Sequence, residues 1–423
     1  MLASRLTLPL LVAATLAALP AAAAPEAPPA PDLAPLVEAA LGADVEAADA
    51  AVAALRDAGQ PAVDALLAAV RTRLGLLATL PGRAYDRYDA VLDRVAGQRL
   101  ARNTGLYWFT DLERAEAEAR RTGRPILSLR LLGRLDEQYS CANSRFFRAL
   151  IYSDPRVKER LRDGFVLHWE PVRDTAPRIT IDLGHGKVIE RTITGNSAHL
   201  LLDAEGRPLD ALPGLVGAAT FARWLDDGVA LAKAVAPGPG GARPARTLAE
   251  VLTERREALM SHWQAELAAI GVRVPKTLVE LRGATGPREL ELLAGRRAAG
   301  ARLGAPARSL VEASQPPDAR LAATLAITKA RVETPMLRVV SNVEADLARD
   351  EVTNALMLHA QVLSWLAAAP RTDRRTLVEA IYRDLFLSPL DDPYFGLRDP
   401  DVFTGLDPAP DVAAGPVLGE PGR

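Results

Sequence analysis

The run Gly123-Arg124-Pro125 and the seven residues after it (ILSLRLL, 126–132) decide the fold. A helix is predicted over 111–122, and Gly123 and Pro125 end it because neither residue sustains a helix. The following residues are almost continuously apolar, which is typical of a strand buried on both faces of a sheet. Further along, Ser140-Cys141-Ala142-Asn143-Ser144 predicts the start of another helix.

More strands and helices follow in a regular order. Asp154-Pro155 begins a short helix that ends near Leu161, and a second strand follows at 165–169. Glycine-containing turns inside apolar or alternating runs predict two hairpins, one over 179–193 around Gly184-His185-Gly186 and one over 199–212. A helix over 221–235 closes the region. The pattern predicts an α/β domain over 105–236.

This middle region resembles the thioredoxin-like domains of exported bacterial proteins over about 130 residues. The residues that carry the resemblance are Gly123-Arg124-Pro125-Ile126-Leu127, Cys141-Ala142-Asn143-Ser144, Ser153-Asp154-Pro155-Arg156-Val157, Phe165-Val166 and 200–206 (LLLDAEG). The resemblance implies catalytic roles for Cys141 and Ser144. It also implies substrate contacts at Ala142, Asn143, Ser197, Ala198 and His199.

Three features depart from the family pattern. Ser144 replaces the second cysteine of Cys-x-x-Cys, so a dithiol cycle is excluded. Ala198 occupies the position of the family's cis-proline, where we expect a trans peptide bond. The loop over 133–140 is longer than in the family and lacks a tryptophan before the cysteine.

Helical regions flank this domain, so the overall class is α+β multidomain. Residues 33–100 predict short helices, either a HEAT-like segment or a generic helical bundle. A Pro/Gly linker (237–246) precedes a helical bundle (247–390) and an irregular tail (391–423). One further helix is expected over 321–330. Within the bundle, Asp350, Glu351, Asn354 and His359 are spaced to line one helix face, which we expect to be solvated.

The first residues have the pattern of an export signal. Residues 1–24 combine one positive charge, an apolar core and small residues before the end, as a signal peptide does. Residues 25–32 form an Ala/Pro-rich tether. We expect a periplasmic or secreted protein, with an uncleaved anchor as the alternative. Any membrane tether would involve only this N-terminal segment.

Composition excludes several function classes. Lys+Arg number 51 and Asp+Glu 53, so the chain has no general basic character and we expect no nucleic-acid partner. Its single cysteine rules out an internal disulfide and a cysteine-based zinc site. The histidines are scattered and no nucleotide-binding or hydrolase motif is present, so we expect no metal and no cofactor.

Two functions stay open for Cys141. The first is thiol-disulfide or isomerase-like chemistry on a protein thiol substrate, with a partly exposed thiol whose pKa is lowered by the helix N-terminus. His199 is then a candidate base, although a histidine bonded to the strand backbone is the favoured alternative. The second function is a non-enzymatic adaptor that binds a protein partner. A purely structural, packed cysteine is the third interpretation.

Overall fold

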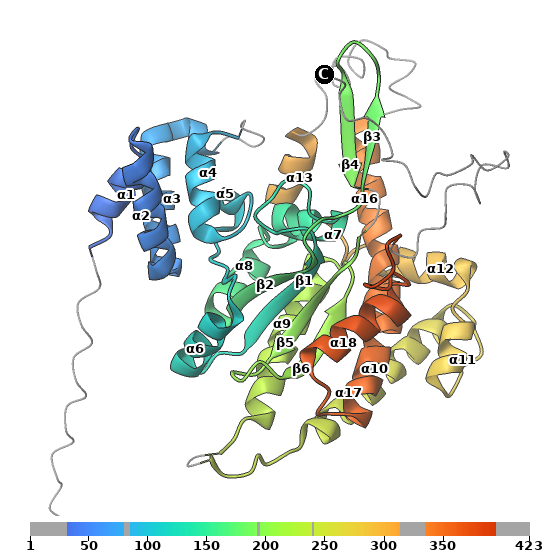
Figure 1. Ribbon diagram of the computed structural model, residues 1–423. Coiled ribbons are helices and arrows are strands. Elements are labelled where there is room, and N and C mark those ends of the chain that lie inside the picture. The colour runs from blue at the N-terminus through green and yellow to red at the C-terminus, as the bar shows by residue number, and fades with distance from the viewer. Residues whose placement is uncertain (1–31, 80–84, 193–194, 239–240, 314–334, 395–423) are drawn as a thin grey trace, which may run out of the picture.

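The computed structural model describes residues 32–79, 85–192, 195–238, 241–313 and 335–394. It is mixed α+β, as the sequence predicts, with one four-stranded sheet and one separate two-stranded sheet (Figure 1). The signal segment 1–24, most of the tether, the helix expected over 321–330 and the tail beyond 394 lie outside the described residues. In the described ranges, no helix is both long and apolar enough to cross a membrane.

The N-terminal region is a group of helices with a hydrophobic core of its own. The elements are α1 (Ala34–Ala40), α2 (Val45–Ala58), α3 (Gln60–Leu74), η1 (Gly75–Thr79), α4 (Arg87–Ala96) and α5 (Ala101–Thr104). Asp44 caps α2 by accepting hydrogen bonds from the backbone N–H groups of Glu46 and Ala47, and Gly59 ends the helix, as predicted. A HEAT-like pairing of these helices stays a prediction.

The main sheet has the strand order β2-β1-β5-β6. Its strands are β1 (Ile126–Leu132), β2 (Val166–Arg173), β5 (Ser197–Leu202) and β6 (Pro208–Pro213). β1 is parallel to β2, whereas β5 is antiparallel to both β1 and β6. All residues of β1 are buried, which confirms the interpretation of ILSLRLL as an interior strand.

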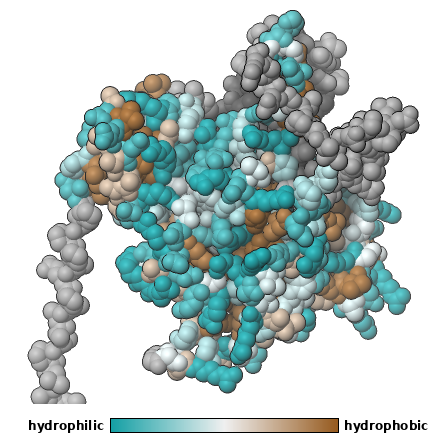
Figure 2. Space-filling model, viewed as in Figure 1, coloured by the Kyte–Doolittle hydropathy of each residue, from teal (hydrophilic) through white to brown (hydrophobic). Residues whose placement is uncertain are grey.

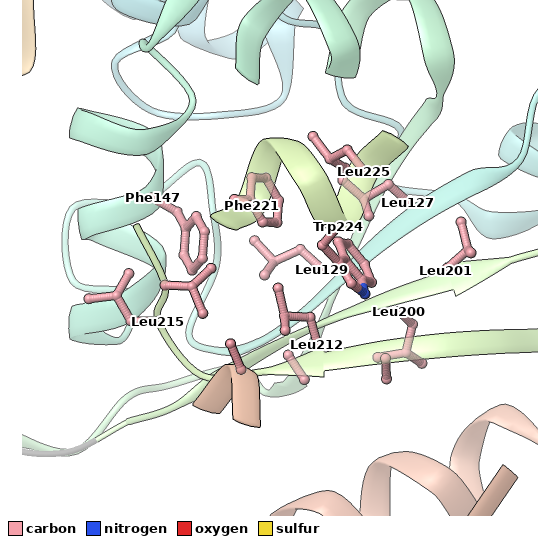
Figure 3. Packing of buried hydrophobic residues seen from close by; sticks show 14 of the residues in the cluster. Leu127, Leu129, Phe147, Leu200, Leu201, Leu212, Leu215, Phe221, Trp224 and Leu225 are labelled. Carbon is pink, nitrogen blue, oxygen red and sulfur yellow. The ribbon is translucent and has the colours of Figure 1, made fainter. Parts of the chain in front are cut away.

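Helices precede, separate and follow these strands. They are α6 (Leu112–Thr122), α7 (Ala142–Phe146), η2 (Phe147–Ile151), α8 (Pro155–Gly164) and α9 (Ala218–Val235). Figure 3 shows Leu129 of β1 and Leu212 of β6 close to Phe221 and Trp224 of α9, all within one buried cluster. The long apolar side chains of α9 therefore cover the sheet.

A hairpin of β3 (Arg178–Asp182) and β4 (Val188–Thr192) interrupts the order between β2 and β5. It forms the separate two-stranded sheet, and it projects away from the main sheet at the top of Figure 1. Gly184 and Gly186 both have positive φ at its turn, as the Gly-His-Gly pattern predicts.

The C-terminal helices pack onto the sheet domain. They are α10 (Leu248–Ala269), α11 (Leu278–Gly283), α12 (Pro287–Arg297), α13 (Ala305–Ala313), α16 (Pro335–Glu351), η4 (Val352–Leu358), α17 (His359–Ala368), α18 (Arg374–Ala380) and η5 (Ile381–Leu385). Trp263, Leu363 and Tyr382 belong to the same buried cluster as the sheet. The domain boundaries stay predictions, but the hydrophobic core is continuous across the linker.

Of the polar face expected to be solvated, Asp350 is exposed, but Glu351 and Asn354 are buried and His359 is half-buried, so the expectation is wrong for these three. Glu351 accepts a hydrogen bond from Thr220 Oγ1 at 2.7 Å, and Asn354 donates one to the backbone oxygen of Leu215 at 2.8 Å. His359 bonds to Asp210. These side chains join the C-terminal helices to the β6–α9 segment.

Candidate functional site

Cys141 is the N-cap residue of α7. Its Sγ accepts a hydrogen bond from the backbone N–H of Ser144 at 3.5 Å. The thiol donates to Ser144 Oγ at 3.2 Å, while that hydroxyl lies 2.9 Å from both Ser140 Oγ and the Cys141 backbone oxygen. The two residues are thus adjacent as predicted, but Ser144 accepts from the thiol rather than donating to it. In this arrangement the neutral S–H group is satisfied inside the protein.

Burial contradicts the prediction of a partly exposed thiol. Cys141 has an exposed fraction of 0%, and so has Ser144. Cys141 belongs to the main hydrophobic cluster of the sheet. A thiolate that attacks a disulfide needs a free approach to its sulfur, and this position does not provide one.

One buried arginine holds the loop over 133–140, which leads directly into Cys141. Arg148, on η2, donates hydrogen bonds to the backbone oxygens of Leu135, Glu137 and Gln138 at 2.7, 2.6 and 3.1 Å. Burial lowers the pKa of this guanidinium to about 10. The longer loop is therefore held in one position next to Cys141.

A second segment, before β5, packs against Cys141. Gly195 has a φ of 134°, and a Cβ atom placed on it would lie 2.5 Å from the Cys141 Cβ. Next to it, Asn196 accepts a hydrogen bond from Asn143 Nδ2 at 3.0 Å. The backbone oxygen of Asn196 accepts another from the buried Tyr382 hydroxyl at 2.9 Å. A residue from the C-terminal helices thus fixes the segment that packs on the thiol.

The residues expected to contact a substrate are mostly inaccessible. Ser197, Ala198 and His199 are buried in β5, so the assignment of these three to a substrate surface is wrong. Ala142 is exposed and Asn143 is half-buried. The described residues contain no cis peptide bond, which agrees with the trans geometry expected at Ala198.

His199 is a buried partner of Tyr152 rather than of Cys141. Its Nε2 lies 2.5 Å from the Tyr152 hydroxyl. Its Nδ1 has no hydrogen-bond partner among the described residues. The ring packs against Phe147, Phe221 and Trp224 in edge-on or tilted contacts. Burial lowers its pKa to about 3, so the ring is neutral. Neither the base for Cys141 nor the backbone-bonded histidine is observed.

Sequence reasoning did not find Arg148 or Tyr382. Arg148 follows two phenylalanines on a core-facing helix, and a charged residue at that place is a signal that it has buried acceptors. Tyr382 offers no comparable signal, because its partners in the sheet lie far away along the chain.

The described residues contain no group of histidine, cysteine, aspartate and glutamate suited to hold a metal ion. Comparison of the chain with protein-family models, with curated protein sequences and with solved structures found no match.

Proposed function

We propose that this chain is a non-enzymatic, exported scaffold protein whose thioredoxin-like middle region binds a protein partner. The observation that carries the proposal is the complete burial of Cys141, which follows an Arg148-bound loop and has Gly195 packed on its Cβ. With Ser144 in place of a second cysteine, the site has neither a resolving thiol nor an approach for a substrate disulfide.

Strand order and direction support the thioredoxin-like part of the proposal. A parallel β1/β2 pair, the two antiparallel strands β5 and β6, and a closing helix α9 agree with that family's arrangement. The cysteine also starts the helix that follows the central strand. The difference from the family lies in the use of the Cys141 site, which contributes to packing.

The β3–β4 hairpin is the surface that we assign to the partner. Four of its apolar side chains are largely exposed: Ile179 (44%), Ile181 (43%), Leu183 (58%) and Val188 (53%). The tip stands at the top of the molecule in Figure 2. Apolar side chains gathered on a projecting element are typical of protein interaction sites.

The base of the hairpin is anchored beside the Cys141 site. Arg145 of α7 donates a hydrogen bond to Thr192 Oγ1, and the Arg178 guanidinium lies 5.3 Å from the centroid of the Tyr139 ring. The 133–140 loop and the cysteine helix thus hold the hairpin in a fixed direction. A fixed presentation lowers the entropy lost when a partner binds.

The test compares three variants of the full chain in affinity capture from extracts of the source cell. We expect Ile179→Thr/Ile181→Thr to lose a specific partner that Cys141→Ala retains. Val279→Thr is the matched control, because Val279 is an exposed apolar residue (80%) far from the hairpin in the sequence. Loss of the partner in Cys141→Ala, or trapping of mixed disulfides on Cys141, would instead support the redox function.

A further inference from the structure

A cavity of about 410 Å³ lies at the outer edge of the sheet, away from Cys141. Four helical elements, α9, α10, η4 and α17, form most of its wall, and β6 and α12 complete it. The lining residues are Leu212, Thr220, Arg223, Trp224, Asp227, Arg255, Ala258, Leu259, His262, Arg297, Ala355, Leu356, His359 and Leu363.

One side of the cavity rests on a buried carboxylate. Asp210 is completely buried and accepts a hydrogen bond from Trp224 Nε1 at 3.0 Å. His359 Nε2 lies 2.9 and 3.1 Å from its two oxygens. Burial by itself raises the pKa of Asp210, but His359, Arg255 and Trp224 outweigh it and hold this pKa below its usual value. The carboxylate is therefore ionised, and its charge is already compensated within the wall.

A second buried carboxylate is compensated in the same way. Glu351 accepts hydrogen bonds from Thr220 Oγ1 at 2.7 Å and from the Gly217 backbone N–H at 3.2 Å. Arg297 Nη1 lies 3.5 Å from the same side chain. The charge of Arg297 is therefore matched by Glu351. Its guanidinium also donates a hydrogen bond to His262 Nε2 at 2.8 Å.

The other two lining arginines, Arg223 and Arg255, have fewer acidic partners than Arg297. Arg223 is exposed and donates to Thr220 Oγ1, while the half-buried Arg255 donates to the backbone oxygen of Asp227. Both of these acceptors are uncharged oxygens. Because Arg297 is paired with Glu351 and Glu266, two lining arginines, Arg223 and Arg255, stand beside one lining carboxylate, Asp227. A bound anion would relieve the repulsion between these like charges.

The other lining residues are apolar. Trp224, Leu259 and Leu363 come from three different helices and give the cavity an aromatic and aliphatic side. Sites for small molecules commonly combine such walls with a few polar groups that orient the ligand. A ligand that suits both sides has an apolar body and one anionic end.

We propose that this cavity binds a small apolar carboxylate, with its carboxylate on Arg223 and Arg255 and its body against Trp224, Leu259 and Leu363. Arginine suits this task because its planar donors match the two oxygens of a carboxylate. The site is separate from the hairpin and from Cys141. The proposal for this cavity does not depend on the proposed scaffold function.

The test is isothermal titration calorimetry of the full chain with octanoate as the probe. We expect one site per chain and a Kd that rises about 10-fold or more in Arg223→Ala and in Arg255→Ala, because each loses a charge-assisted hydrogen bond. Arg383→Ala is the control, since Arg383 is exposed and pairs with the neighbouring Asp384. It should bind octanoate as the unmodified chain does.

A second variant tests the location without removing a charge. Ala258 is exposed and lines the cavity, so Ala258→Trp should fill it and abolish octanoate binding while the unfolding temperature is retained. Octanol should bind at least 10-fold more weakly than octanoate, and inorganic phosphate should not displace octanoate. Absent binding, equal affinity for octanol, displacement by phosphate, or insensitivity to Ala258→Trp would each overturn the proposal.

Discussion

Replacing Gly195 by alanine would test how tightly the segment before β5 packs on Cys141. The φ of 134° at Gly195 is one that side-chain-bearing residues rarely adopt. The new Cβ would also lie 2.5 Å from the Cys141 Cβ and 3.3 Å from its Cα. The backbone of Gly195 or of α7 must therefore move, and neither is the flexible end of a side chain.

Both effects have known magnitudes. A strained backbone conformation costs about 1–3 kcal/mol. Overpacking of a well-filled core adds about 1–3 kcal/mol. Gly195→Ala should accordingly lower the free energy of unfolding by about 2–6 kcal/mol in total.

The matched control is Gly184→Ala at the hairpin turn. Gly184 has a φ of 78°, but a Cβ there would meet no atom within 4 Å. Urea unfolding followed by tryptophan fluorescence and circular dichroism gives both free energies. Gly195→Ala should be the more destabilising by about 1–3 kcal/mol. Equal losses in the two variants would refute the close packing of Gly195 on the thiol.

Three further predictions concern the same region. Because the pKa of buried His199 is lowered to about 3, the folded state binds fewer protons than the unfolded state below pH 6.5, and stability falls on acidification. Between pH 7 and pH 5, the unfolding free energy of the unmodified chain should fall by about 2 kcal/mol more than that of His199→Gln. Urea titration at each pH measures both free energies, and parallel curves for the two proteins would contradict the prediction. Arg148→Met should release the 133–140 loop and raise the alkylation rate of native Cys141 at least 10-fold, whereas an unchanged rate would show that Arg148 does not hold the loop in place. Ser144→Cys should form an intramolecular disulfide, detected by mass spectrometry after thiol blocking, because Ser144 Oγ already lies 3.2 Å from the sulfur; two free thiols after oxidation would exclude that geometry.

The strands and helix starts of the middle region could be predicted because their signals are local. ILSLRLL is almost continuously apolar, Gly-His-Gly suits a tight turn, and Asp154-Pro155 supplies a cap and a first-turn proline. Each of these patterns acts within a few residues, so no knowledge of distant contacts is needed.

The accessibility of Cys141 could not be predicted because it depends on long-range contacts. A helix N-terminus favours an ionised thiol only where solvent and substrate reach it. Here Arg148 holds the loop before Cys141, and Tyr382 fixes the segment that packs on Cys141 through Asn196, which is 186 positions earlier. The sequence shows that the 133–140 loop is longer than in the family, but it does not show in which direction the loop folds.

The polar face on the C-terminal helices illustrates the same limit. Its spacing is that of a solvated helix face, yet Glu351 bonds to Thr220 at a separation of 131 residues and His359 to Asp210 at 149. Buried polar groups need partners, and these partners belong to elements that come together only when the core forms. Periodicity alone does not distinguish the two cases.

The central claim is that Cys141 serves packing and helix capping rather than thiol chemistry. The most direct measurement is the alkylation rate of the native chain by iodoacetamide across a pH series, compared with the rate in denaturing urea. The account predicts strong protection in the native state at every pH at which the chain stays folded, with full reactivity on unfolding. A native thiol that reacts as fast as the unfolded one, with a midpoint below the free-cysteine value of about 8.5, would contradict it.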